Sequence, residues 1–170
     1  MTFHISVPPS FREIRLNKGA VAIVDAEDFD RLNAVRWSVV STANLKYANR
    51  KIRKAGDPLG HAYMHRAILM APVGVPVDHI DSDGLNNRRS NLRLASYSQN
   101  AAHRRRAINN TSGYRGVTRQ WNRWVATLCV NGKQAVIGRF DDPIEAAMAY
   151  DRAALAAFGE FASLNFPEDV

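Results

Sequence analysis

The sequence predicts an α+β protein made of two small modules. In the first module, residues 77–106 read as strand, loop, strand and helix in that order. In the second, three short strand-like runs precede a capped helix, and Asn131-Gly132 is a strong hairpin signal. A polar stretch separates the modules. We therefore expect a first domain over residues 1–107, a linker over 108–112 and a second domain over 113–170.

The first module begins with less clearly marked elements. We expect a loose tail before Arg12 and then, in order, a strand at 20–24, a helix starting at Asp25, strands at 37–40 and 45–49, and an apolar segment at 62–70. The apolar run 73–77 reads as a strand, and residues 92–95 as its partner. Pro72, Gly74 and Pro76 are expected to turn the chain before the first motif strand.

A helix follows the second of these strands. Ser96 and Gln99 have the spacing of a capping box, and we expect the helix to run through Arg106. In the second module the strands are expected at 114–119, 123–130 and 134–138. Its helix has Asp142 as N-cap, Pro143 in the first position and Gly159 at its end. The apolar positions expected on the core side of this helix are Ile144, Ala147, Met148, Ala154, Leu155 and Phe158.

Asp78 and His79 end the first strand of residues 77–106, and Asn100 lies in the first turn of the helix. Neighbouring strand residues point to opposite sides, so Asp78 and His79 suit two separate tasks. Carboxylate and amide oxygens are hard ligands, suited to magnesium, manganese or calcium. A histidine beside such a cation takes a proton from water near neutral pH. The pattern indicates a phosphodiester-cleaving site.

The simpler interpretation of polar loop residues is that they form turns and are solvated. We adopt it for the other loop residues, which are Asp81, Ser82, Asp83, Gly84, Asn86 and Asn87. For His65 we favour a packed histidine bonded to backbone over a catalytic one. His103 shares a helix face with Asn100, so it either approaches the same phosphate or metal or lies on the surface beside phosphates, and we favour the second.

The charge distribution indicates a polyanionic partner. The formal net charge is +7, and residues 84–140 contain eleven Lys or Arg and no Asp or Glu. A surface of one sign needs a partner of the opposite sign, and nucleic acid fits best. A basic membrane-surface helix fits less well because Trp, Gly and strand patterns interrupt the segment. A second basic stretch, 46–54, is either an edge strand protected by charge or another DNA-contacting strip, and the sequence leaves both open.

Composition excludes several other classes. The single cysteine, Cys129, rules out an internal disulfide and a Cys-rich structural zinc site, and we expect it to be a small core residue. No apolar run approaches the eighteen or so residues that span a bilayer, and the first residues lack a signal pattern. We therefore expect a soluble cytoplasmic protein, in a bacterial or phage-infected cell, without a membrane partner.

The stretch from Asp78 to Asn100 resembles the HNH endonuclease motif of the phage and intron-encoded homing type, with Asn91 twelve residues after His79. Three flanking runs match as well, namely Met64-His65-Arg66, Asn87-Arg88-Arg89 and Asn91-Leu92-Arg93. The resemblance implies a ββα-metal (His-Me finger) domain, with the motif at residues 65–106. It also implies Asp78 and Asn100 as ligands of one divalent cation, magnesium or manganese. His79 is then the general base, and Asn91 is the catalytic-site residue that braces the loop. From the residue type alone, a structural brace and a direct contact of Asn91 are about equally favoured.

Residues 113–167 resemble the plant APETALA2/ethylene-response-factor DNA-binding domain. The shared motifs are Tyr-Arg-Gly-Val, Trp-x-Ala, Gly-x-Phe, Ala-Ala-x-Ala-Tyr-Asp-x-Ala-Ala and Leu-Asn-Phe-Pro. The resemblance implies a small three-stranded antiparallel sheet, packed on one helix and laid in the major groove. Thr118 stands where the family usually has Arg, so a base preference does not carry over. We expect Trp124 to pack in the core.

These patterns give a set of predicted DNA-binding residues from both modules, which are Arg88, Arg89, Arg93, His103, Arg104, Arg105, Arg115, Arg119, Trp121 and Arg123. The leading functional hypothesis is a metal-dependent endonuclease acting on double-stranded DNA, either by nicking or by cutting both strands. One motif supplies one site, so cutting both strands needs a dimer or rebinding, and the sequence leaves monomer and dimer open. The alternatives are a non-catalytic DNA-binding regulator and an RNA-binding protein. The second lacks the stacked aromatics of common RNA modules.

Overall fold

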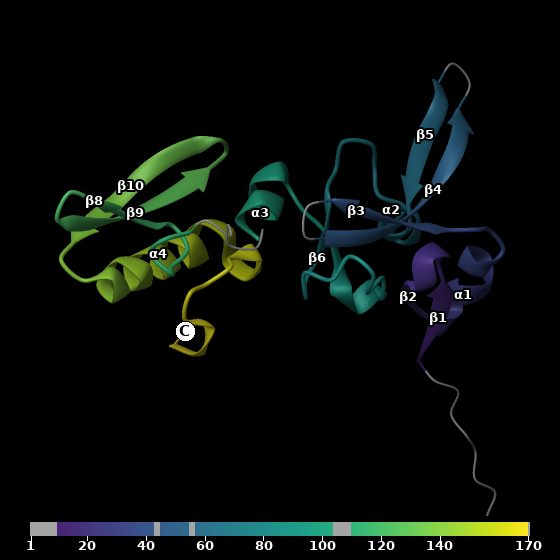
Figure 1. Ribbon diagram of the computed structural model, residues 1–170, viewed down its shortest axis with the longest axis horizontal. Helices are drawn as coiled ribbons and strands as arrows, with labels where there is room; N and C mark the ends of the chain where they lie inside the picture. The colour runs from purple at the N-terminus through teal and green to yellow at the C-terminus, as the bar shows by residue number, and fades with distance from the viewer. Residues whose placement is uncertain (1–9, 43–44, 55–56, 104–109, 170) are drawn as a thin grey trace, which may run out of the picture. The chain divides into compact units, whose positions relative to one another are not determined.

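A computed structural model describes residues 10–42, 45–54, 57–103 and 110–169. Contacts divide the chain into a first unit, Met1–Leu94, and a second unit, Ala95–Val170. Helices and several small antiparallel sheets are mixed in the chain (Figure 1). The first unit holds the pairs β1-β2 and β6-β7 and the sheet β3-β4-β5, and the second holds the sheet β10-β9-β8.

The first unit begins with a hairpin and a helix. β1 (Phe11–Arg15) pairs with β2 (Val21–Asp25), and a 3-10 turn at Asn17–Gly19 lies between them. α1 (Ala26–Asn33) follows directly, with Asp25 at the N-cap position. The strand and the helix start predicted here are confirmed, whereas β1 was not predicted.

The next three strands form a sheet in which β4 is the middle strand. β3 (Ser38–Thr42) pairs with residues 45–49 of β4 (Leu45–Lys54), and β5 (Asp57–Tyr63) pairs with residues 49–54. The edge-strand explanation of the basic stretch therefore does not hold for β4 as a whole. Beyond Asn49, β4 and β5 continue as a two-stranded ribbon.

α2 (Met64–Leu69) leads into the motif strands β6 (Val77–His79) and β7 (Leu92–Leu94), which pair in antiparallel fashion. A 3-10 turn at Arg89–Asn91 precedes β7. The predicted strand at 73–77 is wrong, because the strand begins only at Val77 and Val73 is 97% exposed. Proline lacks the N–H that a strand ladder needs, so the prolines at positions 72 and 76 delay the strand.

The core of the first unit gathers side chains from nearly all of these elements. Its buried members are Ile14, Leu16, Ala22, Val24, Leu32, Trp37, Ala48, Met64, Ile68 and Leu92. Because they come from β1, β2, α1, β4, α2 and β7, the N-terminal elements and the motif strands share one core. The N-terminal hairpin, α1 and β4 thus form the scaffold on which the motif strands rest.

The second unit starts with a short helix and continues as a sheet. α3 (Tyr97–Ala102) has the predicted capping box between Ser96 and Gln99, and its C-cap is His103. The predicted continuation over 104–106 lies outside the described residues. β8 (Val117–Gln120), β9 (Arg123–Val130) and β10 (Lys133–Phe140) are antiparallel neighbours.

Three local signals in the second unit are confirmed. Asn131 and Gly132 have φ values of 52° and 77°, as a tight hairpin between β9 and β10 requires. The Asp142 side chain accepts from the backbone N–H of Glu145 at the start of α4 (Pro143–Phe158). Gly159 ends the helix. Short 3-10 turns at Gly159–Phe161 and Pro167–Asp169 follow.

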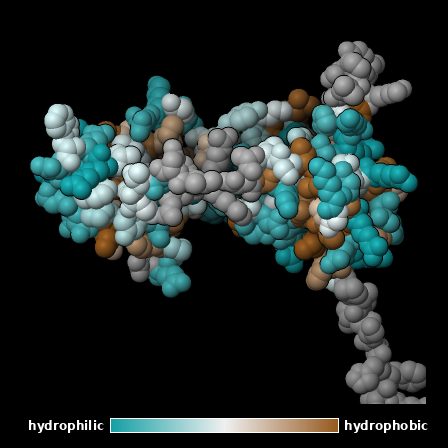
Figure 2. Space-filling view, viewed as in Figure 1, coloured by the Kyte–Doolittle hydropathy of each residue, from teal (hydrophilic) through white to brown (hydrophobic). Residues whose placement is uncertain are grey.

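α4 shares the core of the second unit with the sheet. Buried Ala126 and Leu128 of β9 belong to one cluster with Ala147, Tyr150 and other α4 residues. Small alanines let the helix lie close to the strands. The space-filling view shows mainly hydrophilic residues over this sheet and separate hydrophobic ones along α4 (Figure 2).

Some predicted core positions of the second unit are wrong. Ile144, Met148 and Leu155 are exposed, because the side of α4 that carries Tyr150 and Ala154 is the side that packs. Cys129 is exposed as well. Its neighbours Leu128 and Val130 take the core side of β9, so alternation along the strand sends Cys129 to the opposite face. Trp124 packs against the core, as expected.

The helix α3 is assigned to different domains by the sequence motif and by the contacts. The motif assigns this helix to the nuclease domain, whereas contacts group it with the second unit, where Ser98 Oγ accepts from Asn131 N at 2.9 Å. The domains at 1–107 and 113–170, with a linker at 108–112, stay a prediction. Within the described part of the chain, no helix is long and apolar enough to cross a membrane.

Candidate active site

His79 ends β6 and is enclosed by aromatic rings from two other elements. His79 is 6% exposed. The centroid of its ring lies 5.8 Å from the ring centroid of Tyr47 in β4 and 5.0 Å from that of His65 in α2. Burial lowers the pKa of His79, and Asn87 and nearby carboxylates offset part of this effect. The imidazole is therefore neutral near pH 7, which is the form that accepts a proton.

His65 supports this pocket by packing. Its ring stacks on Tyr63 with centroids 5.4 Å apart, and burial together with repulsion from His79 and Arg66 lowers its pKa to about 3. A histidine with this pKa stays neutral at physiological pH and is a poor proton donor. The packing role favoured from the sequence agrees with this. Within the described chain, however, Nδ1 of His65 is without a hydrogen bond.

Asp78 points to the opposite side of β6 from His79, as alternation requires. It is buried opposite Arg93 of β7, whose Nε and terminal nitrogen each lie 2.9 Å from Asp78 Oδ2. This ion pair holds the carboxylate in place. The guanidinium of Arg93, predicted to bind DNA, is mostly buried in this pair, so its contact with DNA stays a prediction.

The next question is whether the residues around Asp78 suit a divalent cation. In the described residues there is no group of three or more His, Cys, Asp or Glu side chains that could hold a metal ion. A magnesium ion does not require such a group, since it keeps several waters and uses one or two carboxylates. The fixed carboxylate of Asp78, completed by water, fits magnesium and disfavours zinc.

Asn91 braces the loop between the motif strands through three bonds. Its Oδ1 accepts from Asp81 N at 3.0 Å, and its Nδ2 donates to Asp81 Oδ1 at 2.9 Å and to the Asn86 carbonyl at 2.8 Å. Asp81 is thereby more than a solvated turn residue. Its carboxylate also accepts from Asn86 Nδ2 and from Asp83 N. Although burial opposes it, these bonds lower the pKa of Asp81.

Asn87 was missed by the sequence interpretation, which gave it a turn role. It is fully buried, and its Oδ1 and the Nε2 of His79 both lack a well-formed hydrogen bond within the described chain. An interaction with Asn87 nevertheless raises the pKa of His79 against the effect of burial. An imidazole N–H that donates to Asn87 Oδ1 would leave the other ring nitrogen as the acceptor. The signal for this residue was its place between the motif histidine and Asn91.

Gly84 fits the loop against β4. A Cβ added there would overlap the Lys46 carbonyl oxygen and lie 2.5 Å from the Tyr47 ring. We expect Gly84→Ala to lower the stability of the first unit by about 1–3 kcal/mol, because Tyr47 and the loop must separate. Chemical denaturation of the full chain measures this. Gly60→Ala is the control, because its tightest contact is the flexible Ile52 side chain at 3.2 Å. Equal losses for the two variants would contradict the proposed close fit.

Arg89 ties the motif loop to α1. Its Nε lies 2.8 Å from Oδ2 of buried Asp28 and 2.9 Å from Glu27, and its main-chain N donates to Asp25. Burial opposes ionisation of Asp28, yet the bonds from Arg89 and Arg31 outweigh it and lower the pKa of Asp28. The first of the loop arginines, Arg88, donates to Asn86 Oδ1 at 3.0 Å. Both arginines thus have structural partners, and their predicted DNA contacts stay predictions.

The remaining motif residues lie on α3, in the second unit. Asn100 and His103 are half-buried there, and their backbone N–H groups donate to Ser96 and Gln99. The roles of Asn100 as metal ligand and of His103 beside phosphate stay predictions. Arg104 and Arg105 lie outside the described residues.

The sheet of the second unit carries the other predicted DNA contacts. Trp121, in the β8–β9 turn, is 96% exposed. Arg123 is exposed on β9, where it pairs with Asp141 at 2.8 Å. Arg119 lies opposite Trp124 in the register and its guanidinium is 5.6 Å from that ring, so it belongs to the α4 side of the sheet. The open side instead carries Thr118, Gln120, Arg123, Thr127 and Cys129.

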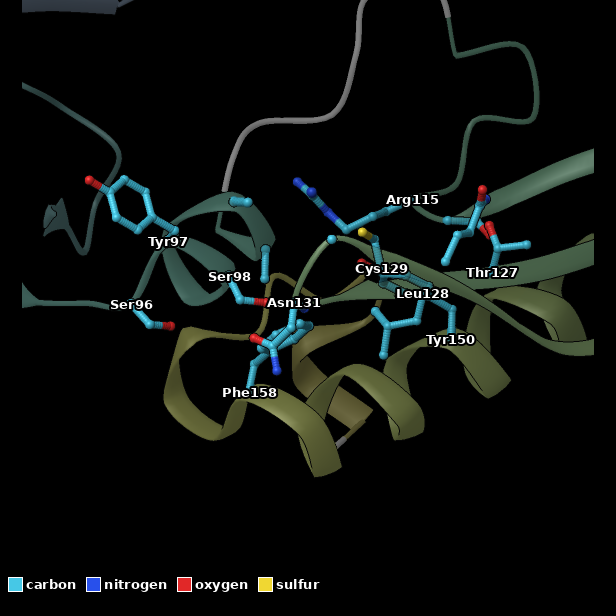
Figure 3. A pocket seen from close by; sticks show the side chains of 15 residues that line it. Ser96, Tyr97, Ser98, Arg115, Thr127, Leu128, Cys129, Asn131, Tyr150 and Phe158 are labelled. Atoms are coloured by element: carbon cyan, nitrogen blue, oxygen red, sulfur yellow. Dashed lines mark hydrogen bonds between the residues drawn. The ribbon is translucent and has the colours of Figure 1, made fainter. Parts of the chain in front are cut away.

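A hollow of about 700 Å³ lies beside β9 within the second unit. Figure 3 shows Ser96, Tyr97 and Ser98 of the α3 region on one side and Arg115 and Thr127 on the other. Arg115 is half-buried, and its backbone N donates to Asn165 Oδ1. The hollow is thus lined from both faces of β9, by Thr127 and Cys129 and by Leu128, and Arg115, one of the predicted DNA contacts, also lines it.

Comparison with known proteins extends these observations. Residues 62–102 match the family model of HNH endonucleases. An uncharacterised HNH endonuclease of Acanthamoeba polyphaga mimivirus is 30% identical over 154 residues, which cover 87% of this chain and 76% of that protein.

The C-terminal region matches plant proteins. Dehydration-responsive element-binding protein 2C of Arabidopsis thaliana is 44% identical over 63 residues, which are 35% of this chain and 18% of that protein. A putative dehydration-responsive element-binding protein 2H from the same plant is 42% identical over 62 residues, 35% of this chain and 40% of its own. The similarity to these plant proteins thus covers one region of each.

Proposed function

The chain belongs to the HNH endonuclease family with an APETALA2-like C-terminal region, and we propose that it is a metal-dependent nuclease that hydrolyses phosphodiester bonds of double-stranded DNA. The observation that carries this proposal is the position of His79. It is a buried, neutral histidine next to a fixed carboxylate, at the end of a strand whose loop is braced by Asn91. We further propose that the enzyme acts in the manner of homing endonucleases, in the cytoplasm of an infected or host cell.

In this proposal His79 is the general base. It takes a proton from the attacking water, and Asn87 holds the ring in the tautomer that leaves one nitrogen able to accept it. Neutral His65 and Tyr47 keep bulk water away from the ring and fix its orientation. Asn91 holds the loop, so that the backbone near His79 keeps its shape when DNA binds.

Asp78 and Asn100 would hold one divalent cation, magnesium or manganese. When bound, such a cation stabilises negative charge on the phosphate and on the departing oxygen. Arg93 orients the carboxylate of Asp78 and limits its movement. Water attack with departure of the 3′ oxygen gives 5′-phosphate and 3′-hydroxyl ends.

The second unit supplies DNA affinity and register. Its open sheet side offers Arg123, while Trp121 at the turn presents a ring to sugar or base, and Arg115 lies beside the hollow. Contacts from Arg to phosphate give affinity, and contacts to base edges give sequence preference. On the open side of the sheet, positions 118 and 129 carry the uncharged side chains of Thr118 and Cys129. Arginines at these two positions would give the face more positive charge.

A supercoiled plasmid tests the proposal. The full chain is incubated with the plasmid in magnesium and, in parallel, in excess EDTA. We expect relaxed circles, or linear product if two chains act together, in magnesium alone. A plasmid left intact in magnesium and in manganese, although the protein binds it, would favour a non-catalytic DNA-binding regulator. A random genomic fragment pool, tested in the same way, excludes the lack of a target site as the reason.

A further inference from the structure

The ribbon made by the outer parts of β4 and β5 is not used by the function proposed above. Beyond the sheet with β3, residues 50–54 of β4 pair with β5 alone, with Lys51 opposite His61. Asn49, which lies opposite Tyr63, still pairs with Ser38 of β3. Figure 1 shows the pair extending past β3. A two-stranded ribbon is narrow enough to enter the major groove of B-DNA.

Alternation along β4 sorts its basic residues onto two faces. Lys51 shares a face with Asn49, and on the same face Asn49 Nδ2 lies 3.1 Å from His61 Nδ1. Lys51 and His61 are both exposed. Arg50 belongs to the other face, where its guanidinium lies 5.7 Å from the centroid of the buried Trp37 ring. The stretch 46–54 is therefore not one uniform strip, and Lys51 is the cation on this face whose side chain is described.

The face that carries Lys51 continues into the active site. Its next pair is Asn49 and Tyr63, and the Tyr63 ring stacks on His65. Tyr47, two residues before Asn49, lies 6.3 Å from Tyr63 and 5.8 Å from His79 between ring centroids. These contacts join the exposed part of the ribbon to the catalytic histidine without a break. The exposed part of the ribbon is thus linked by packing, through Tyr63 and Tyr47, to His79.

We propose that the face formed by Lys51 and His61, above the buried Asn49, binds duplex DNA next to the cleaved bond, with the ammonium of Lys51 on a backbone phosphate. This rests on the proposed function only in taking DNA as the substrate. The charge of Lys51 matches a phosphate, and the exposed imidazole of His61, which lies 3.1 Å from the buried Asn49 amide, offers a polar contact to sugar or base edges. The ribbon thus sets how the strand lies across His79, separately from the contacts of the second unit.

DNA affinity measured without cutting tests this proposal. The full chain carrying His79→Ala is titrated with a short duplex at several salt concentrations, with Lys51→Ala added in one protein and Lys46→Ala in another. Lys46 is an exposed lysine of the same strand on the opposite face. The two variants therefore lose the same charge but from different faces of β4. We expect Lys51→Ala to weaken binding roughly tenfold and to lower the slope of log Kd against log salt by about one.

The comparison of Lys51→Ala with Lys46→Ala decides whether the ribbon face binds DNA. A small effect there with a large effect of Lys51→Ala supports the ribbon face. Equal effects of the two, or no effect of either, would overturn it, because net charge or no contact would then explain the data. Since binding alone is measured, a failure of plasmid cleavage leaves this test intact, and the two proposals fail separately.

Discussion

Replacing His79 by Ala is expected to reduce DNA cleavage by about 10²- to 10⁴-fold, the range that a general base contributes. The imidazole of His79 is buried and neutral near pH 7, and His79 is the residue that ends β6. His65 packs against it, but its pKa of about 3 leaves it a very weak base. Single-turnover cleavage of a labelled duplex measures the rate.

The matched readout for this variant is DNA binding, which we expect to change less than twofold. His79→Gly with added imidazole serves as a second variant, and we expect it to regain part of the lost rate. Cutting by His79→Ala at the wild-type rate would remove the base assignment. A loss that imidazole does not restore, together with lost binding, would point to misfolding of the loop instead.

Replacing Asp151 by Ala is expected to destabilise the second unit by about 3 kcal/mol, since hydrogen bonds to a charged group contribute roughly 1.5–3 kcal/mol each. Asp151 is 4% exposed, and its carboxylate accepts from the backbone N–H groups of Asn165 and Phe166, each at 2.9 Å. Asn165 in turn accepts from Arg115 N, so the loss also loosens a predicted DNA contact. Urea denaturation followed by tryptophan fluorescence measures the stability.

Asp141→Ala is the control for this prediction. Its carboxylate is 83% exposed and meets Arg123 at the surface, and such pairs contribute about 0–1 kcal/mol. We expect a change of less than about 0.5 kcal/mol for Asp141→Ala. If the two variants lose the same stability, the buried hydrogen bonds of Asp151 do not hold the C-terminal segment in place.

The sequence predicted best those elements whose signals are local. The capping box at Ser96, the hairpin at Asn131 and the cap at Asp142 depend on a few neighbouring residues, and all three are found. β5 was missed because Pro58 and Gly60 resemble turn signals, although pairing with β4 overrides them. The exposed side of α4 was missed because periodicity alone does not say which of two apolar sides meets the sheet.

The site was predicted only in part, for a similar reason. The pairing of Asp78 and His79 follows from the motif, and their opposite directions follow from strand alternation. Tyr47 and Gly84 come together only through the contact between the loop and β4, which no local pattern reveals. Asn87 has the residue type of an ordinary turn former, and only its complete burial beside His79 distinguishes it. Long-range packing therefore determines the part of the site that sequence patterns miss.

We propose that Asp78 and Asn100 are both ligands of one divalent cation, and this is the central claim to test. The most direct measurement is manganese binding, followed by electron paramagnetic resonance, to the full chain carrying His79→Ala with a duplex present. We predict one bound ion per chain and at least tenfold weaker binding in both Asp78→Asn and Asn100→Ala, with Asp83→Asn unchanged. Wild-type manganese affinity in either of the first two variants would contradict the claim.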